Sequence, residues 1–377
     1  MRRSEIYIGA LSGTSVDSLD IAAWDFSTPE KIALLASSKV LIESSLKNHI
    51  LTLSTSGTCH FKEFGQLDKQ LGLLFADGVV DLLEKAALSP KDIIAIGSHG
   101  QTVWHEPNLL FPFSIQIGDP NVIAQKTGIV TVADFRRADL ALGGQGAPLV
   151  PAFHHWLFHT KLQNRIILNL GGISNISVLF SDHAKSLLGY DTGPGNALLD
   201  AWTQYHLGLP FDQDGEFAKK GTTNHLLLKK LLADSYFKKP YPKSTGKDTF
   251  NLAWLSKFDV AHLNPEDVQA TLVSLTAISI REEIMKHVDS GAVYTCGGGS
   301  LNPVLMQAIR QALGNAFKVQ TTSLLNLDPE FVESALFAWL ARERLNQRPI
   351  TLSTVTGCTH DTLLGAIYAP KNITSVC

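Results

Sequence analysis

Three glycine-containing turns carry residue types that bind phosphate. They are Ser12-Gly13-Thr14-Ser15, Leu170 to Asn175 (LGGISN) and Gly297-Gly298-Gly299-Ser300. Glycine lets backbone N–H groups approach phosphate oxygens closely, and hydroxyl groups add further donors. Glycine turns are common, but each of these lies at an expected strand end, so together they indicate a site for nucleotide phosphates. The residues predicted to contact the nucleotide are Gly13, Thr14, Ser15, Gly171, Gly172, Ser174, Asn175, Gly297, Gly298 and Gly299.

Two carboxylates follow the first turn, at Asp17 and Asp20. A carboxylate beside a polyphosphate is repelled unless a cation lies between them, so Asp17 and Asp20 are candidate nucleotide-site residues and ligands of Mg²⁺. The alternative is an ordinary polar hairpin tip, because Ser and Asp are common turn formers. The local sequence does not decide between the two.

Asp191 lies in the string Tyr190-Asp191-Thr192-Gly193-Pro194-Gly195-Asn196. We expect a short strand before Asp191 and a helix from about Ala197. This places a carboxylate at the carboxyl end of a strand, which is a common position for catalytic residues in α/β folds. The alternative is a helix cap, but a capping residue would lie nearer the first turn of the helix. We therefore favour a catalytic role.

Two further strings carry side chains suited to a sugar. Residues 98–102 (SHGQT) place His99 and Gln101 directly after an expected buried strand, and residues 134–139 (DFRRAD) supply Arg136 and Asp139. Arginine binds carboxylates, while amides and acids bind hydroxyl groups. A glycine-rich segment containing Gln145 follows. The alternative for the arginines is a surface or interdomain ion pair, worth roughly 0–1 kcal/mol if exposed.

Several familiar motifs are incomplete. His155 and His159 are four residues apart, but Trp156 stands where a zinc protease needs Glu. The run Gly246-Lys247-Asp248 lacks the upstream glycine and the Ser or Thr of a P-loop, and no G-x-G-x-x-G is complete. These gaps argue against P-loop phosphoryl transfer, nicotinamide chemistry and zinc hydrolysis.

Alternating strand and helix signals predict an α/β fold that positions these residues. Two strand–turn–strand units each carry Gly and Ser or Thr at the tip, one near the start of each half of the chain. The predicted strands are 6–11, 21–26, 93–96, 115–117, 129–132, 166–170, 176–180 and 293–296, and the predicted helices are about 61–87, 121–126, 264–288, 303 onwards and 329–346.

The chain of 377 residues is too long for one ordinary core and fits two domains of roughly 150–200 residues. We predict an N-terminal domain over 1–134 and a C-terminal domain over 135–359, with a segment of about 360–377 packing back on the first domain. The junction is placed in the glycine-rich, charged stretch 134–151. Two similar halves facing a cleft are the expected architecture.

Bulk properties exclude several kinds of partner. The formal net charge is −3, which gives no reason to expect nucleic acid or an anionic membrane. No stretch approaches the ~18 apolar residues of a spanning helix, and Ser4, Glu5 and Gly9 interrupt any signal peptide. Without an export signal, the widely spaced cysteines are expected to be free thiols in a reducing compartment. We therefore expect a cytoplasmic protein; the cysteines are Cys59, Cys296, Cys358 and Cys377.

Taken together and in order, seven strings resemble the anhydro-N-acetylmuramic acid kinase family over nearly the whole chain. One departure is Ser18, where the family's first motif has a second glycine. This adds a Cβ at the turn and leaves Asp17 and Asp20 in place. The strings are SGTSVDSLD (12–20), GSHGQTVWHEP (97–107), DFRRADLALGGQGAPLVPAFH (134–154), LNLGGISN (168–175), GYDTGPGN (189–196), PKSTGKDTFNL (242–252) and CGGGSLN (296–302).

The resemblance implies a two-domain actin-like ATPase (ribonuclease H-like) fold with an interdomain cleft, binding ATP and Mg²⁺. It implies that 1,6-anhydro-N-acetylmuramic acid, ATP and water give N-acetylmuramic acid 6-phosphate and ADP, in peptidoglycan recycling and amino-sugar catabolism. Asp191 would be the base, and Glu333 matches a family acid. His99, Gln101, Arg136, Asp139 and Gln145 would hold this small-molecule substrate. A homodimer is expected from the resemblance and from the frequency of homodimers.

Three other functions fit parts of the sequence. Another sugar kinase of the same fold would keep the glycine turns and change the sugar. An actin-like or chaperone ATPase would add polymer contacts or a peptide-binding domain. A glycosidase acting on the anhydro bridge would need a second carboxylate as acid and no nucleotide turns. A panel of sugars tested with ATP separates these possibilities.

Overall fold

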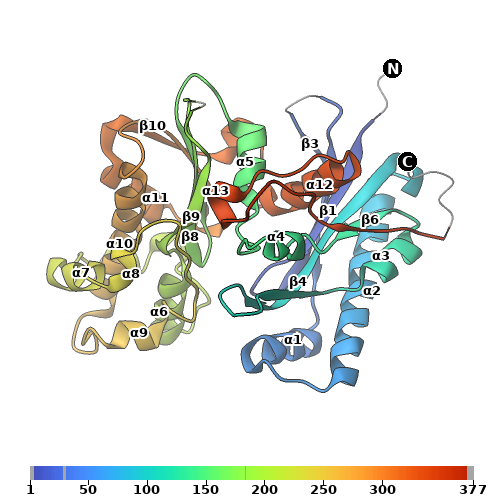
Figure 1. Ribbon diagram of the computed structural model, residues 1–377. Helices are drawn as coiled ribbons and strands as arrows, with labels where there is room; N and C mark the ends of the chain where they lie inside the picture. The colour runs from blue at the N-terminus through green and yellow to red at the C-terminus, as the bar shows by residue number, and fades with distance from the viewer. Residues whose placement is uncertain (1–3, 29–30, 183, 372–377) are drawn as a thin grey trace. The chain divides into compact units, whose positions relative to one another are not determined.

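The computed structural model describes residues 4–28, 31–182 and 184–371, and these form two compact units. The first unit combines the chain up to Phe153 with the chain from Phe331, and the second contains His154 to Glu330. The upstream division falls inside helix α5 (Val150–Phe158). Both units contain a mixed sheet with helices, so the α/β class predicted from the sequence is confirmed (Figure 1).

The first unit is built on a sheet of the order β12-β6-β4-β1-β2-β3, with β5 pairing the second half of β4. Strands β1, β2 and β3 are antiparallel neighbours, whereas β4 is parallel to β1 and β6 is parallel to β4. The strands are β1 (Ile6–Ser12), β2 (Ser18–Asp25), β3 (Ala33–Leu41), β4 (Ile93–Glu106), β5 (Phe113–Ile117), β6 (Thr131–Ala133) and β12 (Ala366–Tyr368). The other helices are α1 (Ser44–Ser56), α2 (Phe61–Lys85), α3 (Pro120–Thr127), α4 (Arg137–Ala141), α12 (Val332–Leu345) and α13 (Ser353–Thr356).

The second unit repeats this topology. Its sheet has the order β11-β10-β7-β8-β9, with an antiparallel β7-β8-β9 meander and parallel β10 and β11. This duplicated order is that of the two-domain actin-like ATPase fold, which confirms the predicted fold; the cleft stays a prediction. The strands are β7 (Arg165–Leu170), β8 (Ile173–Leu179), β9 (Leu188–Pro194), β10 (Gly291–Cys296) and β11 (Phe317–Thr321). The helices are α6 (Ala197–Leu207), α7 (His225–Leu232), α8 (Ser235–Lys238), α9 (Leu252–Ser256), α10 (Pro265–Met285) and α11 (Pro303–Leu313).

Helix α12 belongs to the first unit, although the sequence prediction put residues 135–359 in the second domain. The reason is close packing against two glycines. A Cβ at Gly9 would lie 1.7 Å from the Ser334 carbonyl oxygen, and one at Gly97 would lie 1.9 Å from that of Phe337. Only glycine on β1 and β4 lets the helix backbone come this close. Within the predicted returning segment, β12 pairs with β6, and residues 372–377 lie outside the described residues.

The opposite face of the first sheet is covered by α2, whose apolar residues recur every three or four positions. Leu67, Leu71, Phe75, Val79 and Leu82 are all buried in one cluster with the sheet. Burying each such side chain contributes about 1.5–3 kcal/mol. This stripe is the helical periodicity visible in the sequence, and the helix ends within two residues of its predicted boundary.

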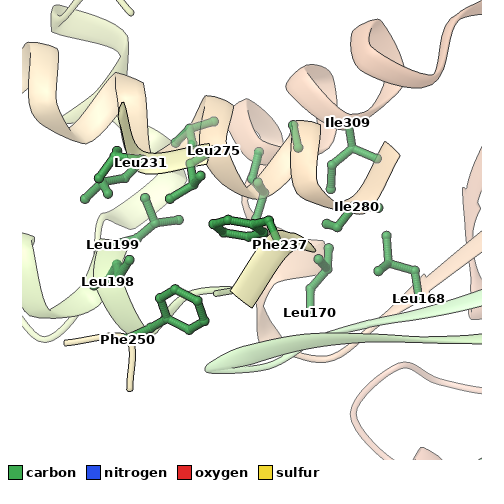
Figure 2. Close-up of a cluster of buried hydrophobic side chains, with 14 of the residues drawn as sticks. Leu168, Leu170, Leu198, Leu199, Leu231, Phe237, Phe250, Leu275, Ile280 and Ile309 are labelled. Carbon is green, nitrogen blue, oxygen red and sulfur yellow. The ribbon is translucent and has the colours of Figure 1, made fainter. Parts of the chain in front are cut away.

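In the second unit, α10 is the central helix of the core. Figure 2 shows Leu275 and Ile280 of this helix among side chains from several elements, including Leu168 and Leu170 of β7 and Phe237 of α8. Asn264 caps the helix by accepting from the Glu266 amide at 3.3 Å. The helix start predicted at residue 264 is thus confirmed, with a proline at the first helical position.

Candidate active site

The hairpin tip between β1 and β2 presents hydroxyl groups to solvent. Thr14 and Ser15 are exposed, and Gly13 has no atom within 4 Å of where a Cβ would stand. The Val16 amide closes the turn by donating to the Gly13 carbonyl at 3.1 Å. Exposed backbone and hydroxyl donors at a glycine turn are suited to bind anionic oxygens.

Asp17 and Asp20 have different neighbours. Asp17 is exposed and accepts from Lys47 of α1. Asp20 lies on β2, where Trp24 on the same strand face donates from its indole N–H to Ser334 of α12. The Asp20 carboxylate also raises the pKa of Glu333 on α12. The structure therefore gives the two predicted metal ligands different surroundings, and only Asp20 faces the acid on α12.

Arg136 and His99 form a hydrogen-bonded pair in the first unit, with Glu333 as a charged neighbour; His99 is buried, Arg136 is half-buried and Glu333 is exposed. Arg136 donates from Nε to His99 Nε2 at 3.0 Å and from Nη1 to the Gly146 carbonyl at 2.8 Å. Burial lowers the pKa of Arg136 to about 10, partly offset by the neighbouring Glu333 and Asp139 carboxylates, so the guanidinium stays charged at neutral pH. It is the cation that faces Glu333.

His99, in its neutral form, supports Arg136. The ring stacks on Phe337 with centroids 4.5 Å apart, and its Nδ1 lies 3.2 Å from the Gly100 carbonyl. Because Nε2 accepts from Arg136, the proton belongs on Nδ1, where it can be donated to that carbonyl. Burial and the nearby Arg136 hold the pKa of His99 well below its usual range. The structure thus places this predicted sugar ligand as a support for Arg136.

Partial loss of contact with water raises the pKa of Glu333, Arg136 lowers it, and Asp20 raises it again, although the residue keeps an exposed surface. Glu333 is in the first turn of α12. An acid in this setting is a candidate for proton transfer or for orienting water. The sequence offered no local signal for it, and only the family resemblance did.

Three other predicted sugar ligands are placed differently from one another. Asp139 has no exposed surface; it accepts from the Gly146 amide and from Thr356 Oγ1, both at 2.7 Å, and so holds the glycine-rich loop. Gln145 is half-buried on that loop, and its backbone N–H donates to the Thr356 carbonyl. Gln101 is 2% exposed, and its Oε1 has no hydrogen-bond partner among the described residues. Gln101 is therefore the one of the three with a buried polar atom left for a ligand.

A polar pocket of about 220 Å³ opens beside His99 in the first unit. Ser98 lines it, is 1% exposed, and has a hydroxyl without a partner among the described residues. Asp68, Arg137 and Tyr368 line it as well. The pocket offers both donors and acceptors to a polar ligand.

In the second unit, the predicted glycine turns lie next to one another. The Asn196 amide donates to the Gly171 carbonyl at 2.8 Å, and the Gly195 amide donates to that of Gly172 at 2.9 Å. A Cβ at Gly299 would lie 2.8 Å from Asn196 Oδ1. The turns 171–172 and 297–299 therefore meet around residues 195–196, as a composite phosphate site requires.

Ser174 and Asn175 lie on β8 behind this turn. Ser174 is fully buried, and its hydroxyl lies 2.6 Å from Thr192 Oγ1, so it braces β8 against β9. Asn175 lies opposite Asp191 in the strand register. Of the residues predicted at this hairpin, the glycines remain the best placed for direct contact with phosphate.

Asp191 lies within strand β9, three residues before its end, and not after the strand as the sequence suggested. The helix that follows has its N-cap at Asn196, so Asp191 is not a helix cap. Its Oδ2 accepts from the Thr245 amide at 2.9 Å, and Tyr236 donates its hydroxyl to the Asp191 carbonyl at 2.8 Å. Burial raises the pKa of Asp191 to about 6, and the Thr245 hydrogen bond moves it the other way. A pKa near neutral pH is what general-base catalysis requires of a carboxylate.

Lys247 is not among the residues predicted from the sequence to contact the nucleotide. A Cβ at Gly172 would lie 2.6 Å from Lys247 Cε, so this side chain passes directly over the glycine turn. Its charge also lowers the pKa of Asp200, which burial raises to about 6. The run Gly246-Lys247-Asp248 fails as a P-loop, but its lysine reaches the glycine turn at 171–172, and the local sequence does not reveal this contact.

Among the residues that the structure describes, no group of three or more His, Cys, Asp or Glu side chains could hold a metal ion. Nor does any helix there have the length and apolar character needed to span a membrane. Cys59 and Cys358 are free thiols, Cys296 is buried with its Sγ 3.9 Å from Asn169 Oδ1, and Cys377 lies outside the described residues.

Comparison with known proteins gives matches over nearly the full chain. A family model described as "Anhydro-N-acetylmuramic acid kinase" matches residues 5–370. A protein of that name from Pasteurella multocida (strain Pm70) is 50% identical over 370 residues, covering 97% of each chain. Another from Shewanella frigidimarina (strain NCIMB 400) is 47% identical over 373 residues, covering 98% of this chain and 100% of the relative.

Solved structures of lower similarity also match most of the chain. A ROK family glucokinase from Streptomyces griseus, in complex with glucose and AMPPNP, is 14% identical with a TM-score of 0.40, covering 90% of this chain and 99% of that one. A dehydratase component A from Acidaminococcus fermentans is 12% identical with a TM-score of 0.46, covering 89% and 98%.

Proposed function

Because this chain belongs to the anhydro-N-acetylmuramic acid kinase family, we propose that it opens and phosphorylates 1,6-anhydro-N-acetylmuramic acid. The products are N-acetylmuramic acid 6-phosphate and ADP, and water supplies the hydroxyl group at C1. The enzyme is a phosphotransferase with an alcohol group as acceptor. The observation that carries the chemical step is Asp191, a carboxylate with a pKa of about 6 and one oxygen held by the Thr245 amide.

Asp191 acts as the general base. It takes a proton from water as the water oxygen bonds to the anomeric carbon and the bond from C1 to O6 breaks. Since Oδ2 accepts from the Thr245 amide, the carboxylate keeps a fixed orientation while it accepts the proton. A pKa near the working pH lets it be both deprotonated and basic enough for this role.

Glu333 and Arg136 act on the sugar side. Glu333 orients the water or the sugar, and Arg136 is the candidate for the lactyl carboxylate, because a guanidinium binds carboxylates through two parallel hydrogen bonds. His99 holds Arg136 in place, and the free Oε1 of Gln101 is suited to a sugar hydroxyl or amide. Asp139 and Gln145 contribute through the loop that supplies the Gly146 carbonyl.

O6, once released, bonds to the γ-phosphorus as ADP leaves. The glycine turns at 12–15 and 171–172, with Gly297 to Gly299, supply backbone donors for the nucleotide, and Lys247 adds a positive charge beside Gly172. Mg²⁺, when bound, offsets phosphate charge. Mg²⁺ bound with a nucleotide needs only one or two protein carboxylates, so Asp20 fits it even though the described residues hold no three-ligand cluster. Asp17 would first have to release Lys47.

The proposal is tested by measuring ADP release from wild type and Asp191→Asn with a panel of sugars. We expect rapid release with 1,6-anhydro-N-acetylmuramic acid, little without sugar, and nearly none from the variant. Equal activity with an ordinary hexose would favour another sugar kinase. Brisk release without any sugar would favour an actin-like ATPase.

In the cell, this reaction would serve peptidoglycan recycling and amino-sugar catabolism. We place the enzyme in the cytoplasm, where ATP is available and thiols such as the exposed Cys59 stay reduced. We expect a homodimer, the commonest soluble assembly. Light scattering after size exclusion gives the mass directly, and a mass of 41.0 kDa would show a monomer instead.

A further inference from the structure

Residues 242–245, here called the strap, run beside Asp191 without being part of any helix or strand. The chain from 239 to 251 lies between α8 and α9 and has neither kind of element. Such a segment has no hydrogen-bond ladder of its own, so side chains must fix its position. Nevertheless, it makes two of the hydrogen bonds that hold the proposed base.

Both of these bonds are made by the main chain of the strap. The Asp191 amide donates to the Lys243 carbonyl at 3.1 Å, and the Thr245 amide donates to Asp191 Oδ2 at 2.9 Å. A third bond comes from Tyr236, whose hydroxyl donates to the Asp191 carbonyl. The backbone and the carboxylate of Asp191 are therefore positioned from outside strand β9.

These contacts converge on the Lys243 side chain, which is 2% exposed. Its Nζ donates to Glu283 Oε1 on α10 at 2.7 Å and to the Tyr236 carbonyl at 3.3 Å, and it lies 4.6 Å from the centre of the Tyr236 ring. Lysine is almost never buried unless it is paired, because removing its charge from water is costly. A buried ion pair therefore adds little net stability, but its directional hydrogen bonds can hold a segment in one position.

We propose that Lys243 is a positioning residue for the reaction: by anchoring the strap to Glu283 and Tyr236, it holds the Thr245 amide and Tyr236 against Asp191. Lys243 does not touch the substrate; it acts through Asp191. The inference rests on the proposed function only in taking Asp191 as the base. It assigns a role to the string PKSTG, which the sequence analysis used only as a family signature.

The test compares two lysines that share one partner. Lys286 also donates to Glu283 Oε1, at 2.8 Å, but it is 40% exposed and caps the end of α10. Lys243→Met frees the strap while leaving Glu283 paired with Lys286, and Lys286→Met removes the other donor and leaves the strap anchored. A double variant, Lys243→Met with Glu283→Gln, removes both charges of the ion pair. This costs less stability than leaving one buried charge alone. Thermal unfolding of each variant checks that it is folded.

We expect Lys243→Met and the double variant to lower kcat by about 100-fold, the loss typical of a misplaced catalytic group, while KM for the sugar and for ATP changes little. Lys286→Met should stay within about twofold of wild type, as for an exposed ion pair. If Lys243→Met matches Lys286→Met, or if only KM rises, Lys243 does not position the base.

The acid limb of the pH profile of kcat gives a second readout. The Thr245 hydrogen bond stabilises the charged carboxylate, so its loss should move the limb of Lys243→Met to higher pH. The other titratable groups here are Tyr236 of α8, whose pKa burial raises far above neutrality, and two groups that contact Tyr190, Glu283 of α10 and His287 just after this helix. A limb that stays in place or moves to lower pH overturns the proposal. If Asp191→Asn itself keeps full activity, the proposed base is wrong instead.

Discussion

Replacing Asp191 by Asn should stabilise the protein while removing its activity. Burial raises the pKa of Asp191 from 3.8 to about 6, so the folded state holds the proton more tightly than the unfolded state does. Its contribution to stability is fully present below pH 4 and is lost as the pH rises to about 6. A shift of about two units corresponds to roughly 3 kcal/mol lost at pH 7.5. Asn is neutral at every pH and can still accept from the Thr245 amide, so the variant avoids this loss.

The assay is urea or thermal unfolding of wild type, Asp191→Asn and the exposed control Asp289→Asn at pH 4 and pH 7.5. The first variant should gain up to about 3 kcal/mol at pH 7.5 and only about 0.5 kcal/mol at pH 4, where the wild-type carboxyl is protonated in the folded state and only roughly 60% ionised in the unfolded state. The control should change little at either pH. If Asp191→Asn is less stable than wild type at pH 7.5, or gains equally at both, burial does not strain this carboxylate.

Three further outcomes are expected. Lys247→Met should raise KM for ATP by about tenfold, with a smaller effect on KM for the sugar, because it removes a charge beside the Gly172 turn; steady-state kinetics with each substrate varied decides this. Arg136→Met should lower kcat/KM for the sugar by about 100-fold. It should also raise the pKa of Glu333, so that any limb of the pH profile due to Glu333 moves to higher pH; an unchanged profile would show that ionisation of Glu333 does not control the rate. Gly97→Ala should cost more than about 3 kcal/mol, because the Cβ would meet the α12 backbone, whereas Gly65→Ala, with open space, should not destabilise; equal melting temperatures would contradict the packing described.

Much of the fold follows from local patterns in the sequence. The two glycine-tipped hairpins, the stripe of α2 and the Asn264-Pro265 helix start are set by residues close together in the chain, where periodicity and capping act. Strand β4 was predicted to stop at Ile96, but it continues to Glu106 because β5 pairs with residues 101–106. Strand β3 and helix α1 were not predicted; β3 alternates between exposed and half-buried residues and carries no buried apolar pattern.

The site depended on contacts between distant residues. Lys243 and Glu283 are 40 positions apart, and Arg136 and His99 are 37 apart, so no local pattern links either pair. Helix α12 returns to the first unit because Gly9 and Gly97 leave room for its backbone. A single glycine in the sequence does not indicate which distant segment packs against it. Residue types indicated which side chains could act, while the fold decided that Asp139 and Ser174 serve as internal supports.

The most direct test of the function follows the oxygen atom that water adds to the sugar. The enzyme is incubated with 1,6-anhydro-N-acetylmuramic acid and Mg-ATP in ¹⁸O-labelled water, and the product is examined by mass spectrometry with fragmentation as soon as it forms. Ring opening by water predicts one solvent oxygen at C1 and an unlabelled O6 bearing the phosphate. A phosphorylated sugar that still contains the anhydro bridge, or an opened sugar formed without consumption of ATP, would contradict the account.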